Sequence, residues 1–272
     1  IAPVLKAGDL IILESTSPVG TLERLAATLA AARPDLAFPA DGSDASDILM
    51  AYCPERIIPG RMMTELVEND RIVGGLTKAA TTAASALYGT FVRGKIVPTD
   101  ARTAEMVKLT ENAYRDVNIA FANELSMVCD GLDIDPWEVI DLANHHPRVN
   151  ILQPGPGVGG HCIAVDPWFI VHAAGETAPL MRTAREVNDR KPDFVVDKIM
   201  AIASPGDRIA CLGLAYKADT DDLRESPAIE IVEALCRKHD GEIMLVEPNI
   251  AQLPPRLSLP KAKLVAMDEA VN

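Results

Sequence analysis

The chain has 272 residues, 48% of them hydrophobic, so it can bury a substantial core. Its net charge of −13 argues against nucleic acid as a partner, because that field repels phosphate backbones. No apolar run reaches the ~18–20 residues that a membrane-spanning helix needs. Five scattered cysteines without a C-x-x-C pair predict neither a disulfide framework nor a metal site. We therefore expect a cytoplasmic protein that can still bind an anionic small molecule through local Arg and Lys side chains.

The first hundred residues alternate between short apolar segments and helical segments. Strands are predicted at 9–16, 48–56, 71–75 and 95–99, and helices between Pro18 and Arg33 and over 79–88. The first strand has the composition of a buried parallel strand. Alternation of this kind is typical of an α/β layered domain, which we place at 1–99.

The central region, 100–203, is predicted to be helical. A long helix over 103–131 carries apolar residues at three- and four-residue intervals: Met106, Leu109, Ala113, Val117, Ala120, Phe121, Leu125 and Val128. Another helix starts at Asp135-Pro136. A third runs from about 179 towards 203, and Pro192 is expected to kink it or to start a new helix.

The last region, 204–272, begins a second βαβ unit. A strand at 208–217 ends in a glycine turn, and a helix at 228–239 and a strand at 242–248 follow. The predicted fold class is therefore α/β, with a partial Rossmann-like N-terminal domain, a central long-helix region and a partial second Rossmann-like domain. We expect that both ends of the chain are cut.

A glycine-rich segment, GPGVGG at 155–160, satisfies the pattern G-x-G-x-x-G. A dinucleotide-binding loop follows a strand and opens a helix, whereas this segment follows NILQP and precedes HCIAVDP. We predict instead an ordered loop whose backbone N–H groups approach a ligand closely and point at anionic oxygens.

Cys162 at the end of this loop is the candidate reactive thiol. Aimed N–H groups favour a thiolate and stabilise an oxyanion on a carbon bonded to sulfur. Cys129, Cys211 and Cys236 lie among apolar residues and are interpreted as structural. The adjacent His161 implies no Cys-His dyad, because neighbouring side chains usually diverge.

Lys108, Asn112 and Arg115 fall on one face of the long helix. Taken alone, they are interpreted as a solvated polar face rather than a functional one.

Five segments carry a family resemblance: ESTSPVGT, AYCPERIIPG, EMVKLTENAYRDVNIAFANEL, HPRVNILQPGPGVGGHCIAVDPWF and GLAYKADTDDLRESPA. In this order, over nearly the whole chain, they resemble the nucleotide-sugar 6-dehydrogenases. The resemblance implies oxidation of the C6 alcohol of a UDP-sugar to a carboxylate by two NAD⁺, through an aldehyde and a thioester. Within the family it is closest to the branch that acts on UDP-N-acetyl-D-mannosamine.

The resemblance also implies roles for individual residues. Cys162 matches the nucleophile, and Lys108 and Asn112 match the groups that stabilise the oxyanion and transfer protons. Asp166 matches an acid that assists the thiol and water chemistry. Thr16 and Glu55 match positions that order the hydrolytic water near the nicotinamide, Thr16 thereby also contacting the cofactor.

Further matched positions bind the substrate or the cofactor by the same resemblance. The predicted substrate contacts are Arg56, Ile57, Arg115, His146, Arg148, Gly159 and Lys217, and Arg224 is predicted to reach the cofactor. Val165 stands where the UDP-glucose branch has a lysine, and Pro59 where it has a glutamate. Both departures favour the N-acetylmannosamine branch.

Several alternatives stay open at this stage. The substrate could be UDP-N-acetylglucosamine or UDP-glucose, or the chain could be a non-catalytic nucleotide-sugar-binding fragment. The joint presence of Cys162, Lys108, Asn112 and Asp166 argues against the last. The family's glycine fingerprint and ribose-binding acid are missing from this sequence, so we expect little or no dehydrogenase activity from the 272-residue chain alone. The resemblance further implies a homodimer formed through the central helices.

Overall fold

The computed structural model describes residues 1–39, 45–57 and 60–271. The chain divides into two compact units, the first covering Ile1–Glu111 and the second beginning at Asn112, and each is described by itself. In the described residues, no helix combines the length and the apolar character needed to cross a membrane.

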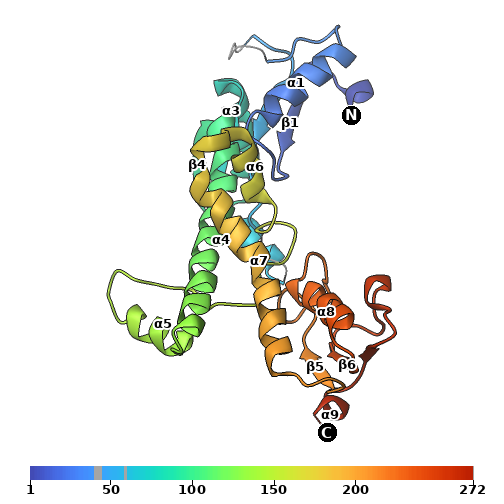
Figure 1. Cartoon of the computed structure of the whole chain (residues 1–272). Coiled ribbons are helices and arrows are strands. Elements are labelled where there is room, and N and C mark those ends of the chain that lie inside the picture. The colour runs from blue at the N-terminus through green and yellow to red at the C-terminus, as the bar shows by residue number, and fades with distance from the viewer. Residues whose placement is uncertain (40–44, 58–59, 272) are drawn as a thin grey trace. The chain divides into compact units, whose positions relative to one another are not determined.

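The first unit contains a four-stranded sheet (Figure 1). Its strands are β1 (Leu10–Leu13), β2 (Leu49–Tyr52), β3 (Arg71–Gly75) and β4 (Ile96–Asp100), in that spatial order. β1 is parallel to β2, β3 is antiparallel to β2, and β4 is parallel to β3. The parallel pairing predicted for the first strand is confirmed, but its residues are half-buried, because β1 lies at an edge of this sheet. The carboxyl-terminal ends of β1 and β2 therefore point to one end of the sheet, and those of β3 and β4 point to the opposite end.

Helices cover both faces of this sheet. α1 (Thr21–Ala32) packs Leu22 and Leu29 against Met50, whereas α3 (Lys78–Tyr88) packs Tyr88 against Ala51 on the other face. Successive strand residues point to opposite faces, and this alternation produces the layered arrangement that the sequence predicted. A short 3₁₀ turn (Ala2–Val4) precedes β1. The sequence did not predict α2 (Met62–Glu68), whose two methionines are exposed and form no apolar stripe.

Four helices form the centre of the chain: α4 (Ala101–Gly131), α5 (Pro136–Asn144), α6 (Asp166–Ala174) and α7 (Pro179–Ile202). α5 begins as predicted, with the Asp135 carboxylate accepting from the Trp137 N–H. The helix α7 continues through Pro192, so the predicted start of a new helix there is wrong, and the alternative of a kink stays a prediction. α6 was not predicted, since its four consecutive apolar residues lack a helical period.

The apolar residues predicted to form one stripe on α4 divide between two environments. Ala113 and Ala120 are buried, and Ala120 packs against Ala184 and Val187 of α7. Phe121 and Val128, by contrast, are 55% and 52% exposed. Only part of the stripe therefore belongs to the core of this chain.

The C-terminal part of the second unit is a parallel three-stranded sheet. It contains β5 (Ile209–Leu212), β6 (Ile243–Val246) and β7 (Ala262–Leu264), in that order. α8 (Pro227–Lys238) packs on it and on α7, and a 3₁₀ turn (Pro255–Leu257) and α9 (Met267–Ala270) complete it. Ser226 and Pro227 occupy the predicted N-cap and first position of α8. The Ser226 hydroxyl donates to the Leu214 carbonyl (2.7 Å), which links the helix start to the loop after β5. The predicted α/β class with two Rossmann-like domains is confirmed.

Candidate active site

Cys162 lies in a turn between the glycine-rich loop and α6, and its side chain is exposed. Its carbonyl accepts from the N–H groups of Val165 (3.1 Å) and Asp166 (2.8 Å), so the turn leads directly into the helix. The other four cysteines are buried or half-buried. Burial raises the pKa of the Cys53 and Cys236 thiols and that of Cys211 to about 11, which disfavours their reactive thiolate forms.

Asn112 and Asp166, two of the predicted catalytic residues, are in direct contact. The Asp166 side chain, at the first position of α6, is 4% exposed and accepts from Asn112 Nδ2 (2.5 Å). Asn112 is buried as well. This contact fixes the start of α6, four residues after the thiol, against α4.

The glycines of the 155–160 loop pack against the chain itself. A Cβ on Gly159 would lie 2.5 Å from Tyr216 Cβ and 2.7 Å from the Glu225 carbonyl oxygen, and one on Gly160 would meet the Tyr216 ring at 2.9 Å. Gly157 is similarly close to Pro227. The chain itself therefore covers the Cα side of these three glycines, and the predicted approach of their backbone N–H groups to a ligand stays a prediction.

We expect Gly159→Ala to lower the free energy of unfolding by about 1–3 kcal/mol, because the new methyl group clashes with closely packed atoms. Urea unfolding of the chain measures the effect. Gly131→Ala is the matched control, since a Cβ there meets nothing within 4 Å. Equal stability of the two variants would contradict the packing role.

The segment that follows β1 and contains Thr16 lies beside the segment that follows β2 and contains Glu55. The Glu55 N–H donates to the Glu14 carbonyl (3.2 Å), which brings the segment after β2 beside the one that contains Thr16. Glu55 Oε1 accepts from the backbone N–H of Arg56 (2.5 Å) and of Ile57 (2.6 Å). These contacts hold the Glu55 carboxylate beside the carboxyl-terminal ends of the parallel strands β1 and β2. Sheets of α/β proteins usually bind ligands at these ends of their strands.

Arg71 also contacts Glu55. Its side chain is 2% exposed, and Nη1 lies 3.6 Å from Glu55 Oε2. Arg56 forms an ion pair with Glu111, and Lys108 is half-buried on the part of α4 that belongs to this unit. Pro59 lies outside the described residues.

The remaining predicted contacts are exposed side chains of the second unit: Arg115, His146, Arg148, Lys217 and Arg224. Arg224 forms an ion pair with Asp222 (2.7 Å), and this hydrogen-bonded pairing lowers the pKa of the Asp222 carboxyl to about 2. Val165 is exposed next to the turn that contains the thiol. Their contacts with a ligand stay predictions.

Sequence reasoning missed a group of buried polar residues between α4 and α7. Asp116 and Asn123 of α4 and Arg185 and Asn188 of α7 are each at most 1% exposed. Arg185 Nη1 lies 2.5 Å from Asp116 Oδ1. Burial raises the pKa of Asp116, and the Arg185 charge opposes this shift. The spacing of Asn112, Asp116 and Asn123 places all three on one face of α4, and this was the available signal.

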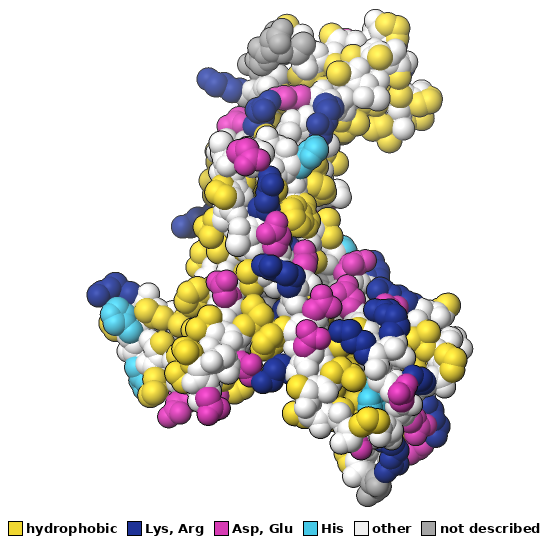
Figure 2. Space-filling view, in the orientation of Figure 1, with side chains coloured by type: hydrophobic (Ala, Val, Ile, Leu, Met, Phe, Trp, Pro, Cys, Tyr) yellow, Lys and Arg dark blue, Asp and Glu magenta, His cyan; other side chains and the backbone are white. Residues whose placement is uncertain are grey.

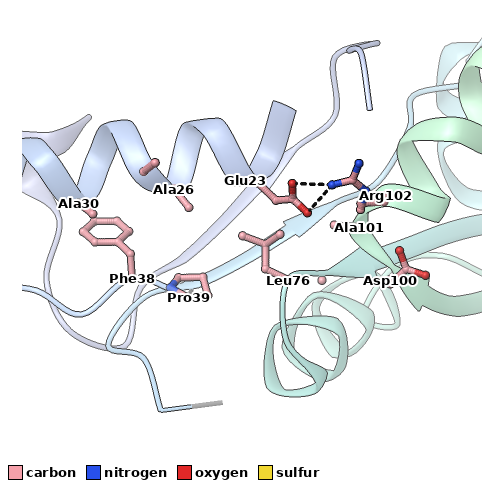
Figure 3. Close-up of a pocket in the computed structure, with 11 residues that line it drawn as sticks. Glu23, Ala26, Ala30, Phe38, Pro39, Leu76, Asp100, Ala101 and Arg102 are labelled. Atoms are coloured by element: carbon pink, nitrogen blue, oxygen red, sulfur yellow. Dashed lines mark hydrogen bonds and ion pairs between the residues drawn. The ribbon is translucent and has the colours of Figure 1, made fainter. Parts of the chain in front are cut away.

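A cavity of about 620 Å³ lies elsewhere in the first unit (Figure 3). α1 contributes Ala26 and Ala30, and Glu23 pairs with Arg102 (2.9 Å) at its rim. The lining of this cavity includes Asp100 at the carboxyl-terminal end of β4. Thr16 and Glu55 follow β1 and β2, at the opposite end of the sheet. None of the predicted site residues lines this cavity.

The described residues fit only part of a dinucleotide site. Thr16 lies at the carboxyl edge of β1 and β2, a position suited to contact with a cofactor. The G-x-G-x-x-G segment at 155–160 does not fit, because no strand directly precedes it in the described part of the chain and a turn separates it from α6. The structure thus agrees with the sequence in rejecting this segment as the fingerprint.

Three family models of the UDP-glucose/GDP-mannose dehydrogenases match the chain in order. The NAD-binding domain matches residues 1–92, the central domain 102–190 and the UDP-binding domain 210–272. The chain therefore includes regions that match an NAD-binding domain and a UDP-binding domain of this family.

Curated relatives match nearly the whole chain. An NDP-N-acetyl-D-galactosaminuronic acid dehydrogenase of Ralstonia nicotianae is 62% identical over 94% of this chain and 61% of its own length. A UDP-N-acetyl-D-mannosamine dehydrogenase of Campylobacter jejuni is 59% identical over 100% of this chain and 68% of its own. The solved UDP-N-acetyl-mannosamine dehydrogenase of Staphylococcus aureus matches 99% of this chain and 62% of its own, with a TM-score of 0.81 and 45% identity. The chain thus spans between 61% and 68% of the length of these proteins.

Proposed function

Because the chain belongs to the UDP-glucose/GDP-mannose dehydrogenase family, we propose that the protein containing it oxidises C6 of UDP-N-acetyl-D-mannosamine to the carboxylate. NAD, when bound, supplies the oxidising power by accepting a hydride in each of two steps. The observation that carries the proposal is the exposed Cys162 thiol, four residues before an Asp166 that is buried and held by Asn112.

The chemistry assigned to the chain's own residues follows from this arrangement. The Cys162 thiolate adds to C6 of the aldehyde and forms a C–S bond, which retains the intermediate after the first oxidation. Loss of the second hydride from this adduct gives a thioester. Water then adds to the thioester carbonyl, the C–S bond breaks, and the thiol and the carboxylic acid are released. Lys108 and Asn112 are assigned to stabilise the oxyanion, and Asp166 to move protons between water and sulfur.

The identity of the sugar rests on the relatives and on Val165. The Campylobacter jejuni relative acts on the N-acetylmannosamine sugar by its name, and the Ralstonia relative is named for an N-acetyl-galactosaminuronic acid. Val165 lacks the charge of the lysine expected in the UDP-glucose branch and is exposed beside the thiol. An N-acetylated hexose is therefore favoured over glucose.

The test compares two proteins: the 272-residue chain, and the same chain extended by the segments of the Campylobacter jejuni relative that lie outside the match. NADH formation is measured with the UDP-linked forms of N-acetylmannosamine, N-acetylglucosamine, N-acetylgalactosamine and glucose. We expect the extended protein to form two NADH per N-acetylmannosamine sugar and the chain alone to form little or none. Preference for another sugar would overturn the substrate. Nucleotide-sugar binding without turnover by the extended protein would instead favour the binding-fragment alternative.

We also propose that the protein is a dimer. Hydrophobic side chains gather over α5 and the adjoining part of α4 (Figure 2). Phe121, Leu132, Trp137 and Leu142 are each more than half exposed. A patch of this kind on a central helix pair is typical of a surface that a second copy covers. Sedimentation equilibrium of the chain tests this, and a monomer at micromolar concentration would contradict it.

A further inference from the structure

The segment that carries the thiol has little regular structure of its own. Residues 155–163, all of them described, form neither a helix nor a strand and include four glycines. Glycine gains the most conformational freedom when a loop is released, so a segment of this composition needs contacts from outside to keep one conformation. Besides the close packing of its glycines, the hydrogen bonds that hold the two ends of the segment therefore define the position of Cys162.

The start of the segment is tied to α4. The Gly155 N–H donates to Asn123 Oδ1 (2.9 Å), and the Asn123 side chain is fully buried. The amide group of Asn123 also donates through Nδ2 to Asn188 Oδ1 (2.9 Å) on α7. Because both ends of the Asn123 amide are engaged, its oxygen is fixed in the direction of Gly155.

The same hydrogen-bond chain continues to the end of the segment. Asn188 Nδ2 donates to Asp116 Oδ1 (2.8 Å), and the same oxygen accepts from Arg185 Nη1 (2.5 Å). Arg185 Nη1 also donates to the Ile163 carbonyl (3.5 Å), and this is the longest of the hydrogen bonds that link Gly155 to Ile163. Gly155 and Ile163 are thereby joined through four side chains.

We propose that Asp116, Asn123, Arg185 and Asn188 form a loop clamp that positions the Cys162 thiol for its reaction. These are positioning residues, since they act on the loop and contact no reacting atom. The Asn112–Asp166 contact lies beyond the clamp and fixes the start of α6. The proposal rests on the proposed function only in assigning the reaction to Cys162, because the clamp itself is a property of the loop.

Two variants open the clamp at different ends. Asn123→Ala removes the acceptor of Gly155. Arg185→Lys keeps a positive charge beside Asp116 but loses the guanidinium geometry in which one nitrogen, Nη1, reaches both Asp116 and Ile163. Ser126→Ala is the matched control: Ser126 accepts from Lys191 Nζ (2.5 Å) and donates to the Asn123 backbone carbonyl (2.7 Å), and its removal leaves the side-chain amide of Asn123 unchanged.

The experiment attaches a nitroxide spin label to Cys162, the exposed thiol, in the 272-residue chain, and mass spectrometry verifies the labelled site. We expect a slow-motion spectrum for the wild-type and Ser126→Ala chains, and rotational correlation times at least twofold shorter for Asn123→Ala and Arg185→Lys. The double variant should add little to either single change, because both open one clamp. Superimposable spectra, or a wild-type label that already moves freely, would overturn the proposal.

A second measurement distinguishes this inference from the proposed function. In the extended protein, a loosened nucleophile should lower kcat by about 10-fold to 100-fold at an unchanged KM for the UDP-sugar. An extended protein without turnover would refute the proposed function and leave the spectra to decide the clamp. Mobile labels with a wild-type kcat would show that the clamp does not position the thiol, and would overturn the proposal.

Discussion

Replacement of Cys162 by serine in the extended protein should lower the rate of uronate formation by on the order of 10³-fold or more. A hydroxyl is a far weaker nucleophile than a thiolate at neutral pH, so the aldehyde is not retained on the enzyme and no thioester forms. The measurement is the NADH yield per sugar together with the mass of the protein after acid quenching. The wild-type protein should carry an acyl adduct on Cys162 that the variant lacks.

Cys236→Ala is the control for this variant, since Cys236 is half-buried on α8 and burial raises its pKa. Its turnover should stay within about twofold of wild type, as expected of a substitution outside the site. A Cys162→Ser protein that forms two NADH per sugar at the wild-type rate would exclude Cys162 as the nucleophile.

Arg185→Met should lower the free energy of unfolding of the chain by about 3–5 kcal/mol at pH 8, because it leaves the fully buried Asp116 without its cation. The pH dependence has a definite sign. Burial raises the pKa of Asp116 in the folded state. The stability contribution of a carboxyl with a raised pKa is present below its unfolded pKa and is lost as the pH rises through the folded pKa. The cost of Arg185→Met should therefore be smaller at pH 5 than at pH 8.

Urea unfolding at the two pH values measures this difference. Lys198→Met is the matched control, since the exposed Lys198–Asp130 ion pair joins the same two helices and should contribute at most about 1 kcal/mol. The double variant Asp116→Leu/Arg185→Met should recover most of the lost stability, because it removes both charges. An Arg185→Met chain that loses no more stability than Lys198→Met, at either pH, would contradict the expected burial cost.

Local patterns were enough to predict most helices and strands. β3 begins and ends where the sequence placed it, and α1, α3, α5 and α8 lie within a few residues of their predicted bounds. Prolines, caps and apolar periods act over a few residues, so they are legible without the fold. The sequence did not predict α2, α6, the short α9 or β7, and α2 and α6 lack a clear amphipathic period.

The candidate site was predicted less completely, for a related reason. Cys162 was identified as the reactive thiol from the residues that flank it in the sequence. In the structure it is exposed, whereas the other four cysteines are buried or half-buried. The glycines around it were interpreted as exposing backbone N–H groups to a ligand, but the sequence did not predict that Tyr216 and Glu225, more than fifty residues away, occupy the space beside Gly159. The roles of Lys108, Thr16 and Glu55 rest on resemblance and stay predictions.

The sequence by itself determined the order of the elements, the α/β class, the reactive residue types and the family resemblance, because each of these depends on short-range patterns or on motifs in order. The tertiary structure alone decided which polar groups are partners. Asn112 meets Asp166 across 54 positions and Asp116 meets Arg185 across 69. It also decided that β3 runs antiparallel to β2. A polar residue on a helix face has the same local pattern whether water or a buried partner satisfies it, and only the packing of α4 against α7 distinguishes the two.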